Sequence, residues 1–526
     1  MRKVRNFLFI MYDQLRPDYL GCYGHPVIDT PAFDSMSRRG VLFSRAYCQS
    51  PVCGSSRMSF YTGRYPTSHG TTWNNVPLRL SELTMGDYLR PLGYRVAVVG
   101  ESHFVPDLEG MARAGLSPND GGVGALIAQG GFEPWDRDDQ LHPDSEPDLD
   151  FRYNLFLKEQ GYGGRNPWHE HANSALGPGG EMLSGWYMRN AHLPSRVREE
   201  HSETAYFTDR AMAFIDDAGE QPWCLHLSYM KPHWPYMAPA PYHDMYRGEN
   251  DVLSANRTER ELHEAHPVVR AFMNHDDSQS FRDEAHRRHV IPTYMGLIRQ
   301  LDDHLARLVH FLEVRGRMND TLIVLTSDHG GYLGDHWLGE KELFHEESVR
   351  IPMIVVDPSP EADARRGERD DRLVESIDLL PTFLDSLGQP AQPHRLEGRS
   401  LRPLLHGQED VPWRDAAFSE HDYAFMRARR ELGLQPHEAR SYMVRTDRWK
   451  YVHYEHFRPQ LFDLQSDPME QNDLGADPSH AAIRGEMSER LFQWFRTRAV
   501  RSTMSDETVE RRTATARERG IIIEIW

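Results

Sequence analysis

Short apolar segments that alternate with helical segments are the feature that most constrains the fold of this chain. The apolar runs, which are typical of buried central strands, lie at residues 7–12, 96–99, 224–227, 322–325 and 353–356. The clearest helical pattern between them covers residues 292–312, where leucine and isoleucine side chains recur on one stripe. Strands that alternate with helices predict a doubly wound α/β domain with a parallel sheet.

The pattern changes near residue 410. Residues 441–444 and 449–454 are predicted to form antiparallel strands, with a turn at Thr446 and Asp447. Residues 480–495 have the spacing of an amphipathic helix. The sequence therefore predicts a smaller α+β C-terminal domain. The expected division is a large α/β domain, a small subdomain and a terminal arm, at residues 1–410, 411–500 and 501–526.

Two segments of the large domain, residues 106–197 and 238–285, are rich in Gly, Asp, His, Trp and Pro and have weak periodicity. They are interpreted as insertions over the edge of the sheet, where substrate-shaping loops usually lie. The chain ends in an apolar run at residues 521–526 after a charged arm. An exposed apolar end is a liability, so this run is expected to dock on its own domain or on a second subunit of a homo-oligomer.

Composition excludes some classes of partner. The chain has 526 residues and a net charge of −19, from 60 basic and 79 acidic residues, which argues against nucleic acid. This balance does not forbid an anionic substrate, because local positive charge in a cleft can outweigh a distant field. The 4 cysteines are too few for a disulfide framework. The first apolar run is too short for a signal peptide, and no run has the length of a membrane span, so we expect a cytoplasmic protein.

Polar side chains follow two of the predicted strands. Asp13 and Gln14 come directly after the first strand, and Asp328 and His329 follow the strand near residue 325. In open α/β sheets ligands bind beyond the carboxyl ends of the strands, so these side chains are expected to converge on one divalent cation. Three oxygen ligands and one nitrogen suit Mn²⁺, Ca²⁺ or Mg²⁺. An aspartate after a strand is otherwise a cap or turn residue, but two such pairs favour a metal site.

Between these pairs lies the segment CGSSRMSFYTGR at residues 53–64. If Cys53 begins a helix, Arg57 lies one turn further on the same face. A helix N-terminus favours anions, so a nucleophile there would face a site suited to a tetrahedral oxyanion.

These motifs, in this order, resemble the sulfatase family of the alkaline phosphatase superfamily, and in particular its phosphonate monoester hydrolase branch. The resemblance covers about residues 5 to 475 apart from the insertions. It implies a large mixed, mostly parallel sheet flanked by helices. It also implies that a formylglycine-generating enzyme oxidises Cys53 to formylglycine, whose hydrate attacks sulfur or phosphorus. Ser55 stands where the family usually has Pro or Ala. The alternative is therefore an unmodified Cys53 that acts as a thiolate nucleophile or metal ligand, or an inactive protein.

The metal ligands match the phosphonate hydrolase version of the family. Ordinary sulfatases more often have Asp-Asp and Asp-Asn pairs, whereas this chain has Gln14 and His329. These ligands carry less negative charge, which favours Mn²⁺ over Ca²⁺.

The segment KPHWP at residues 231–235 resembles a sulfatase motif whose histidine protonates the leaving alcohol. The resemblance gives this role to His233 and places Lys231 among the substrate-binding residues. Lys341 resembles the family lysine that holds a substrate oxygen, and a charge there stabilises an oxyanion. The simpler alternatives are a proline-rich surface loop and a solvated lysine.

The segment Gly-Glu-Ser-His at residues 100–103 follows another strand. His103 matches the sulfatase histidine that contacts the formylglycine hydrate, and it is the candidate base for the second step. Glu101 replaces the sulfate-binding lysine. It must be protonated, turned away or paired with a cation, or else it selects cationic or monoanionic substrates. Asn74, in preference to Asn75, corresponds to an active-site asparagine of phosphonate hydrolases.

The sequence therefore predicts a metal-dependent hydrolase of small anionic esters. Its expected activity is hydrolysis of sulfate monoesters, of the arylsulfatase type, with side activity toward phosphonate monoesters and phosphodiesters. The alternative is that phosphonate monoesters and phosphodiesters are the main substrates. A non-catalytic metal-binding homologue with unmodified Cys53 is the third possibility.

Overall fold

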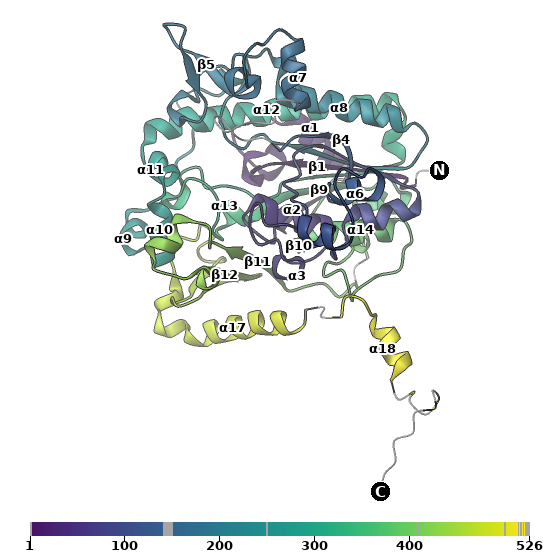
Figure 1. Ribbon diagram of the computed structural model, residues 1–526. Helices are drawn as coiled ribbons and strands as arrows, with labels where there is room; N and C mark the ends of the chain where they lie inside the picture. The colour runs from purple at the N-terminus through teal and green to yellow at the C-terminus, as the bar shows by residue number, and fades with distance from the viewer. Residues whose placement is uncertain are drawn as a thin grey trace.

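The fold was analysed in a computed structural model, which describes residues 3–139, 151–248, 251–408, 410–498, 501–513, 515, 518 and 520. A central sheet of eight strands runs through the large domain (Figure 1). In spatial order its strands are β10 (Glu368–Glu375), β2 (Val41–Tyr47), β9 (Arg350–Val356), β8 (Thr321–Thr326), β1 (Asn6–Tyr12), β7 (Trp223–Tyr229), β3 (Arg95–Gly100) and β4 (Glu133–Arg137). The prediction of a mostly parallel sheet in an α/β domain is confirmed, and each predicted apolar run lies in a strand.

Strand β9 departs from the parallel arrangement. It pairs antiparallel with both of its neighbours, β8 and β2, so the prediction that residues 353–356 form a parallel strand was wrong. The connection from β8 to β9 is a loop that ends in the short helix α13 (Glu346–Val349). A parallel neighbour needs a long crossover back to the other edge of the sheet, usually through a helix. This connection instead stays at the end of the sheet where β8 finishes. The loop therefore lies at the carboxyl ends of the parallel strands.

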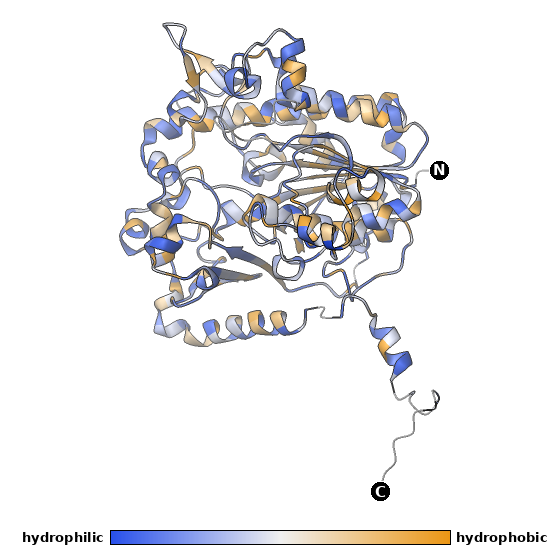
Figure 2. Ribbon diagram, in the orientation of Figure 1, coloured by the Kyte–Doolittle hydropathy of each residue, from blue (hydrophilic) through white to orange (hydrophobic). Residues whose placement is uncertain are grey.

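Strand β1 is buried on both faces, as the apolar run predicted. Its alternate side chains Phe7, Phe9 and Met11 belong to one core cluster, and Leu8, Ile10 and Tyr12 belong to the other. Helices α8 (Glu203–Ala218) and α12 (Glu284–Val314) cover one face of the sheet, and α2 (Cys53–Thr62) and α14 (Leu379–Ser386) cover the other (Figure 1). Figure 2 shows hydrophobic residues gathered on the central strands and hydrophilic residues on the outer surfaces of the helices.

The C-terminal region forms a second, antiparallel sheet. Its strands are β11 (Ala416–Asp422), β12 (Arg440–Thr446), β13 (Trp449–Tyr454) and β14 (Gln460–Asp463), in that order. Helix α17 (Ala481–Arg496) packs on this sheet through the buried side chains Met487 and Leu491. The predicted strands and helix of this region are therefore confirmed.

Helix α18 (Asp506–Arg512) extends away from the body of the molecule (Figure 1). The apolar run at residues 521–526, on which the expectation of a homo-oligomer depends, lies outside the described residues. In the part of the chain that the structure describes, no helix is both long and apolar enough to cross a bilayer.

The segment at residues 106–197 is only partly an insertion. Strand β4 extends the central sheet by pairing with β3 in parallel. Further along, β5 (Ser174–Leu176) and β6 (Met182–Ser184) form a separate antiparallel hairpin, which Figure 1 shows beyond α12. This strand β4 was missed because its sequence, EPWDR, has no apolar run.

Candidate active site

Three of the four predicted metal ligands, Asp13, Asp328 and His329, converge with Cys53 at the carboxyl ends of the parallel strands. Ligand atoms of Asp13, Cys53, Asp328 and His329 all lie within 4.8 Å of one another, and all four residues are buried. Asp13 follows β1, and Asp328 and His329 follow the neighbouring strand β8. Cys53 is the first residue of α2. Motifs that are far apart in the sequence thus lie together at one site in the fold.

The donor atoms at this site fit a divalent cation. One carboxylate oxygen of Asp13 and both polar atoms of the Gln14 amide are buried without a hydrogen-bond partner among the described residues. His329 Nδ1 lies 2.8 Å from the Gly330 carbonyl, to which it donates, so Nε2 keeps its lone pair for a metal. Burial lowers the pKa of His329 to about 4, which keeps the imidazole neutral. Buried polar atoms without partners cost free energy, and a bound cation would satisfy the oxygens of Asp13 and Gln14.

Cys53 lies close to the candidate metal ligands and to Lys341. Its Sγ is 3.0 Å from His329 Nε2 and 3.3 Å from Lys341 Nζ. Burial, together with the charge of Asp13, raises the pKa of the Cys53 thiol well above its ordinary value. The unmodified side chain is therefore a neutral thiol, which is a weak nucleophile.

Arg57 organises the carboxylates rather than the sulfur atom. Its guanidinium is completely buried and donates to Asp328 at 3.0 Å, to Asp13 at 3.0 Å and to Glu101 at 2.6 Å. Within the described chain, none of its hydrogen bonds goes to Cys53. It also donates to Ser228 Oγ, at 2.6 Å. The sequence analysis missed Ser228, whose only signal was a small polar residue near the end of an apolar strand.

Glu101 is paired with Arg57 and His103 instead of being open to substrate. Its carboxylate lies 2.6 Å from Arg57 and 2.7 Å from His103 Nδ1, and the residue is fully buried. Burial raises the pKa of Glu101, but Arg57 and His103 outweigh it and hold the pKa well below its usual range. His103 also approaches Asp13, since ligand atoms of Asp13, Glu101 and His103 lie within 4.8 Å of one another. Asp139, also missed, accepts hydrogen bonds from the backbone N–H groups of residues 102 and 103.

His233 and Lys341 lie together on another side of Cys53. Lys341 Nζ is 2.8 Å from His233 Nε2, and His233 Nδ1 is 2.7 Å from the Trp234 carbonyl. Burial, reinforced by Lys341, lowers the pKa of His233 well below its ordinary value. Burial opposes the charged form of Lys341 too, but Cys53, Glu340 and Asp13 leave its pKa raised. In this pair the lysine therefore carries the proton and donates to the imidazole.

Lys231 is directed away from this group. Its ammonium donates to Asn173 Oδ1 at 3.0 Å and to the Pro235 carbonyl at 2.7 Å. Burial lowers its pKa to about 8. These contacts fasten the segment that carries His233, so the structure gives Lys231 a positioning role within the predicted motif.

Asn74 reaches the first turn of α2. Its side-chain oxygen accepts a hydrogen bond of 2.7 Å from the Gly54 N–H group, next to Cys53. Asn75 has a positive φ of 64° and is exposed, as in a turn. The structure thus brings Asn74, and not Asn75, to the nucleophile position.

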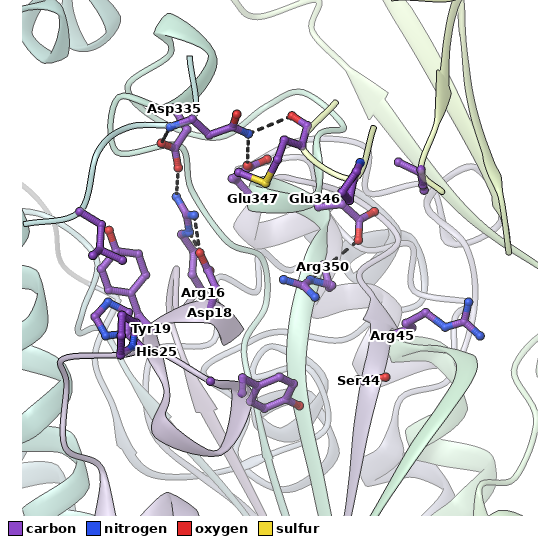
Figure 3. Close-up of a pocket in the computed structure, with 18 of the residues that line it drawn as sticks. Arg16, Asp18, Tyr19, His25, Ser44, Arg45, Asp335, Glu346, Glu347 and Arg350 are labelled. Atoms are coloured by element: carbon purple, nitrogen blue, oxygen red, sulfur yellow. Dashed lines mark hydrogen bonds and ion pairs between the residues drawn. The ribbon is translucent and has the colours of Figure 1, made fainter. Parts of the chain in front are cut away.

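A cavity of about 620 Å³ is lined by charged residues that include Arg16, Asp335 and Arg350 (Figure 3). None of the predicted site residues lines it. Arg16 is one of the residues that line this cavity. It pairs with Asp18 and with Asp335, each at 2.6 Å, and donates to the carbonyls of residues 331 and 332. Arg16 therefore braces the loop that follows His329, and the cavity is separate from the site of chemistry.

Comparison with known proteins agrees with this geometry. Residues 5–389 match the model of the sulfatase family, and residues 334–497 match that of the C-terminal region of N-sulphoglucosamine sulphohydrolase. The multifunctional alkaline phosphatase superfamily protein PehA of Trinickia caryophylli is 31% identical, over 95% of this chain and 96% of that protein. An arylsulfatase of Clostridium perfringens is 26% identical, over 89% and 90%.

Solved structures give the same result. The phosphonate monoester hydrolase SpPMH of Silicibacter pomeroyi superposes with a TM-score of 0.82 and 28% identity, over 96% of this chain and 98% of that one. The phosphonate monoester hydrolase of Agrobacterium radiobacter gives a TM-score of 0.78 and 27% identity, over 94% and 95%. The sulfatase model covers well over half of this sequence. The relatives named above are also matched over most of their own length. The chain belongs to the sulfatase family, within the alkaline phosphatase superfamily.

Proposed function

We propose that the protein hydrolyses phosphonate monoesters and phosphodiesters with a formylglycine made from Cys53 by a formylglycine-generating enzyme. The observation that carries this proposal is the position of Cys53 between the candidate metal ligands and the Lys341–His233 pair. As a neutral buried thiol the side chain has little use as a nucleophile. An aldehyde hydrate at the same position has two hydroxyl groups, one for attack and one for release.

Asp13, Gln14, Asp328 and His329 would hold a divalent cation, for which we favour Mn²⁺ over Ca²⁺ because the set contains one amide and one imidazole. When bound, the cation stabilises negative charge on the reacting oxygens. Arg57 holds Asp13 and Asp328 in place through its hydrogen bonds to both carboxylates. Glu101, held by the same guanidinium, orients His103 beside Asp13.

The chain's own residues then serve two steps. In the first, one hydrate hydroxyl group loses its proton to solvent, its oxygen forms a bond to phosphorus, and the bond from phosphorus to the oxygen of the leaving alcohol breaks. The Lys341 ammonium stabilises the negative charge on the phosphoryl oxygens as the bond to phosphorus forms; it then passes its proton to His233 Nε2, from which the leaving alcohol is protonated. In the second, His103 takes the proton of the remaining hydroxyl group. The aldehyde re-forms as its bond to the phosphonate oxygen breaks.

Two observations favour phosphorus esters over the sulfate monoesters expected from sequence. Glu101 and Arg57 neutralise each other, so the site lacks the cation that the sulfate-binding lysine provides in sulfatases. Gln14 and His329 are phosphonate-hydrolase ligands, and the structural matches described above are phosphonate monoester hydrolases. Sulfate monoesters remain the second candidate, because His103 matches the sulfatase pattern and the ester is also a monoanion.

Mass spectrometry of the peptide that contains residue 53 tests the nucleophile. We expect a mass that corresponds to formylglycine, and we expect the Cys53→Ala variant to lose turnover. Active protein with unaltered cysteine at residue 53, or full turnover by the alanine variant, would overturn the mechanism.

The substrate class is tested by kcat/KM on 4-nitrophenyl phenylphosphonate and 4-nitrophenyl sulfate with Mn²⁺-loaded protein. The two esters share a leaving group, so the ratio reports the preference for the central atom. We expect the phosphonate to be the better substrate. A larger value for the sulfate would restore the expectation from sequence, and turnover of neither would favour the non-catalytic alternative.

A further inference from the structure

Two aromatic side chains, the half-buried Trp73 and the exposed Phe425, meet near the first turn of α2. The ring of Phe425, which is 63% exposed, stacks on the indole of Trp73 with centroids 5.9 Å apart and planes at 18°. The other aromatic partner of Trp73 is the buried His421, at 5.8 Å. Neither Trp73 nor Phe425 belongs to the hydrophobic core clusters of the described residues. Packing of the core therefore does not account for this pair.

The pair is close to the site of chemistry. A Cβ atom placed on Gly54 would lie 3.3 Å from the Cα of Asn74, so these two backbones are in contact. Trp73 is the next residue, about 3.8 Å along the chain. Its loop is fastened to the C-terminal region, because Thr72 Oγ1 donates to Asp422, the last residue of β11, at 2.8 Å. Both domains therefore contribute to this part of the rim.

A second group of aromatic side chains lies beside His233, where the leaving group is expected. His233, the proposed acid, packs against Trp234 with ring centroids 4.8 Å apart. Trp234 in turn meets Trp186 of the insertion edge-on, at 4.6 Å. Among the described residues, no ring contact joins these tryptophans to Trp73 or Phe425. The site thus has two separate aromatic walls, one beside the acid and one beside Asn74.

Two aromatic walls suit a substrate that has two organic groups. A sulfate monoester has a single organic group, which must leave past the acid. A phosphonate monoester or phosphodiester has a second organic group, which stays on phosphorus and points sideways during in-line attack. Exposed aromatic rings favour aryl and other apolar partners, which they bind by offset or edge-on stacking. An exposed apolar surface beside a reactive site is a typical mark of such binding.

We propose that Trp73 and Phe425 form a subsite for the retained apolar substituent of the ester, with an aryl group preferred over a methyl group. This inference rests on the proposed function, because only phosphorus esters retain such a substituent. Phe425 then determines specificity without taking part in the chemistry. Its contact is made equally with bound substrate and with the transition state, so its loss should raise KM and leave kcat unchanged.

The test compares 4-nitrophenyl phenylphosphonate with 4-nitrophenyl methylphosphonate, which differ only in the retained group. For Phe425→Ala we expect KM for the phenyl ester to rise about tenfold, with kcat and both constants for the methyl ester unchanged. Phe425→Tyr should keep the preference for phenyl. The matched control is Phe492→Ala, a similarly exposed phenylalanine on α17 (55%), which should behave as wild type.

Equal losses on both esters, or no loss on either, would overturn the subsite. The first result would mean a structural role or a contact with the common leaving group, and the second would mean no contact. Wild-type turnover of the two esters is the internal check on the proposed function. If formylglycine-containing wild type hydrolyses neither ester, the proposed function fails; if it hydrolyses both and Phe425→Ala changes nothing, only the subsite fails.

Discussion

At the scale of the residue, Arg57 shows how one side chain assembles the site. The sequence placed it one turn from Cys53, beside the nucleophile. In the fold its guanidinium instead contacts the carboxylates of Asp13, Glu101 and Asp328, which all lie in the interior. Buried carboxylates repel one another and need a hydrogen-bonded cation to remain ionised. The arginine therefore acts on the nucleophile through the residues that surround it.

A second buried residue, His69, makes stability depend on pH. Its Nε2 lies 3.1 Å from Ser59 Oγ, and its Nδ1 accepts from the Thr71 N–H group at 3.1 Å. Burial, with the nearby positive charge of Arg64, lowers its pKa from 6.5 to about 3. The folded protein thus resists a proton that the unfolded chain accepts. The contribution of neutral His69 to the free energy of unfolding is complete above pH 6.5 and is lost as the pH falls toward 3.

We therefore expect the His69→Gln variant to show a weaker pH dependence than wild type. Between pH 6 and 4 the slope of the unfolding free energy should fall by about 1.4 kcal/mol per pH unit. Urea unfolding at a series of pH values measures this slope. The exposed His437→Gln change is the control and should leave it unaltered. An unchanged slope in His69→Gln would contradict the burial of a neutral imidazole.

At the scale of the element, β13 supports the loop that carries Lys341. Lys450 of this strand is completely buried and donates to the Phe344 carbonyl at 2.8 Å. It also pairs with Glu346 at 2.9 Å and with Glu470 at 2.7 Å. The small sheet is thereby joined to the segment just after Lys341. An ion network in the interior fixes this connection between the two sheets.

Replacement of Lys450 by methionine should break this connection. The change leaves the buried carboxylate of Glu470 without its cation and removes one of the cations near the partly exposed Glu346, so we expect a loss of about 3–5 kcal/mol in the free energy of unfolding. We also expect a lower kcat, because the Lys341 loop loses its support. Denaturant unfolding and steady-state kinetics measure the two effects.

A double variant, Lys450→Met with Glu470→Gln, should recover part of the stability because one buried charge is removed. The control is Arg490→Met, whose partner Asp415 is 78% exposed, and it should cost less than about 1 kcal/mol. Similar losses for Lys450→Met and Arg490→Met would show that the buried network does not hold the loop.

At the scale of the whole molecule, the cation should link chemistry to stability. The net charge is −19, and some of the acidic side chains that contribute to it are buried together at the site. A cation that binds only the folded chain stabilises it by about 2.7 kcal/mol at one hundred times its dissociation constant. We therefore expect the melting temperature of chelator-treated protein to rise when Mn²⁺ is added.

The Asp328→Asn variant should lose most of this rise, since it lacks one of the proposed ligands. Asp216→Asn, which changes a half-exposed carboxylate on α8, is the matched control and should keep it. Differential scanning fluorimetry with and without Mn²⁺ measures the difference. An equal rise in Asp328→Asn and wild type would place the cation elsewhere.

The sequence by itself determined the parts of this protein that depend on local pattern. Apolar runs such as that of β1 identified the central strands, and the polar residues directly after them, including Asp13 and Asp328, identified one edge of the sheet. The segment that begins at Cys53 identified the candidate nucleophile and the family. The inferences about the strands and the family are confirmed, because strand burial and strand ends depend on neighbouring residues, whereas the role of Cys53 stays a prediction.

Only the tertiary structure decided the features that depend on contacts between distant segments. It turned β9 antiparallel, neutralised Glu101 with Arg57, and directed Lys231 away from Cys53 toward Asn173. It also brought the rings of Trp73 and Phe425, which lie more than 300 residues apart in the sequence, into contact. No periodicity in the sequence records such contacts, because each is set by how the packed elements place side chains that lie far apart along the chain.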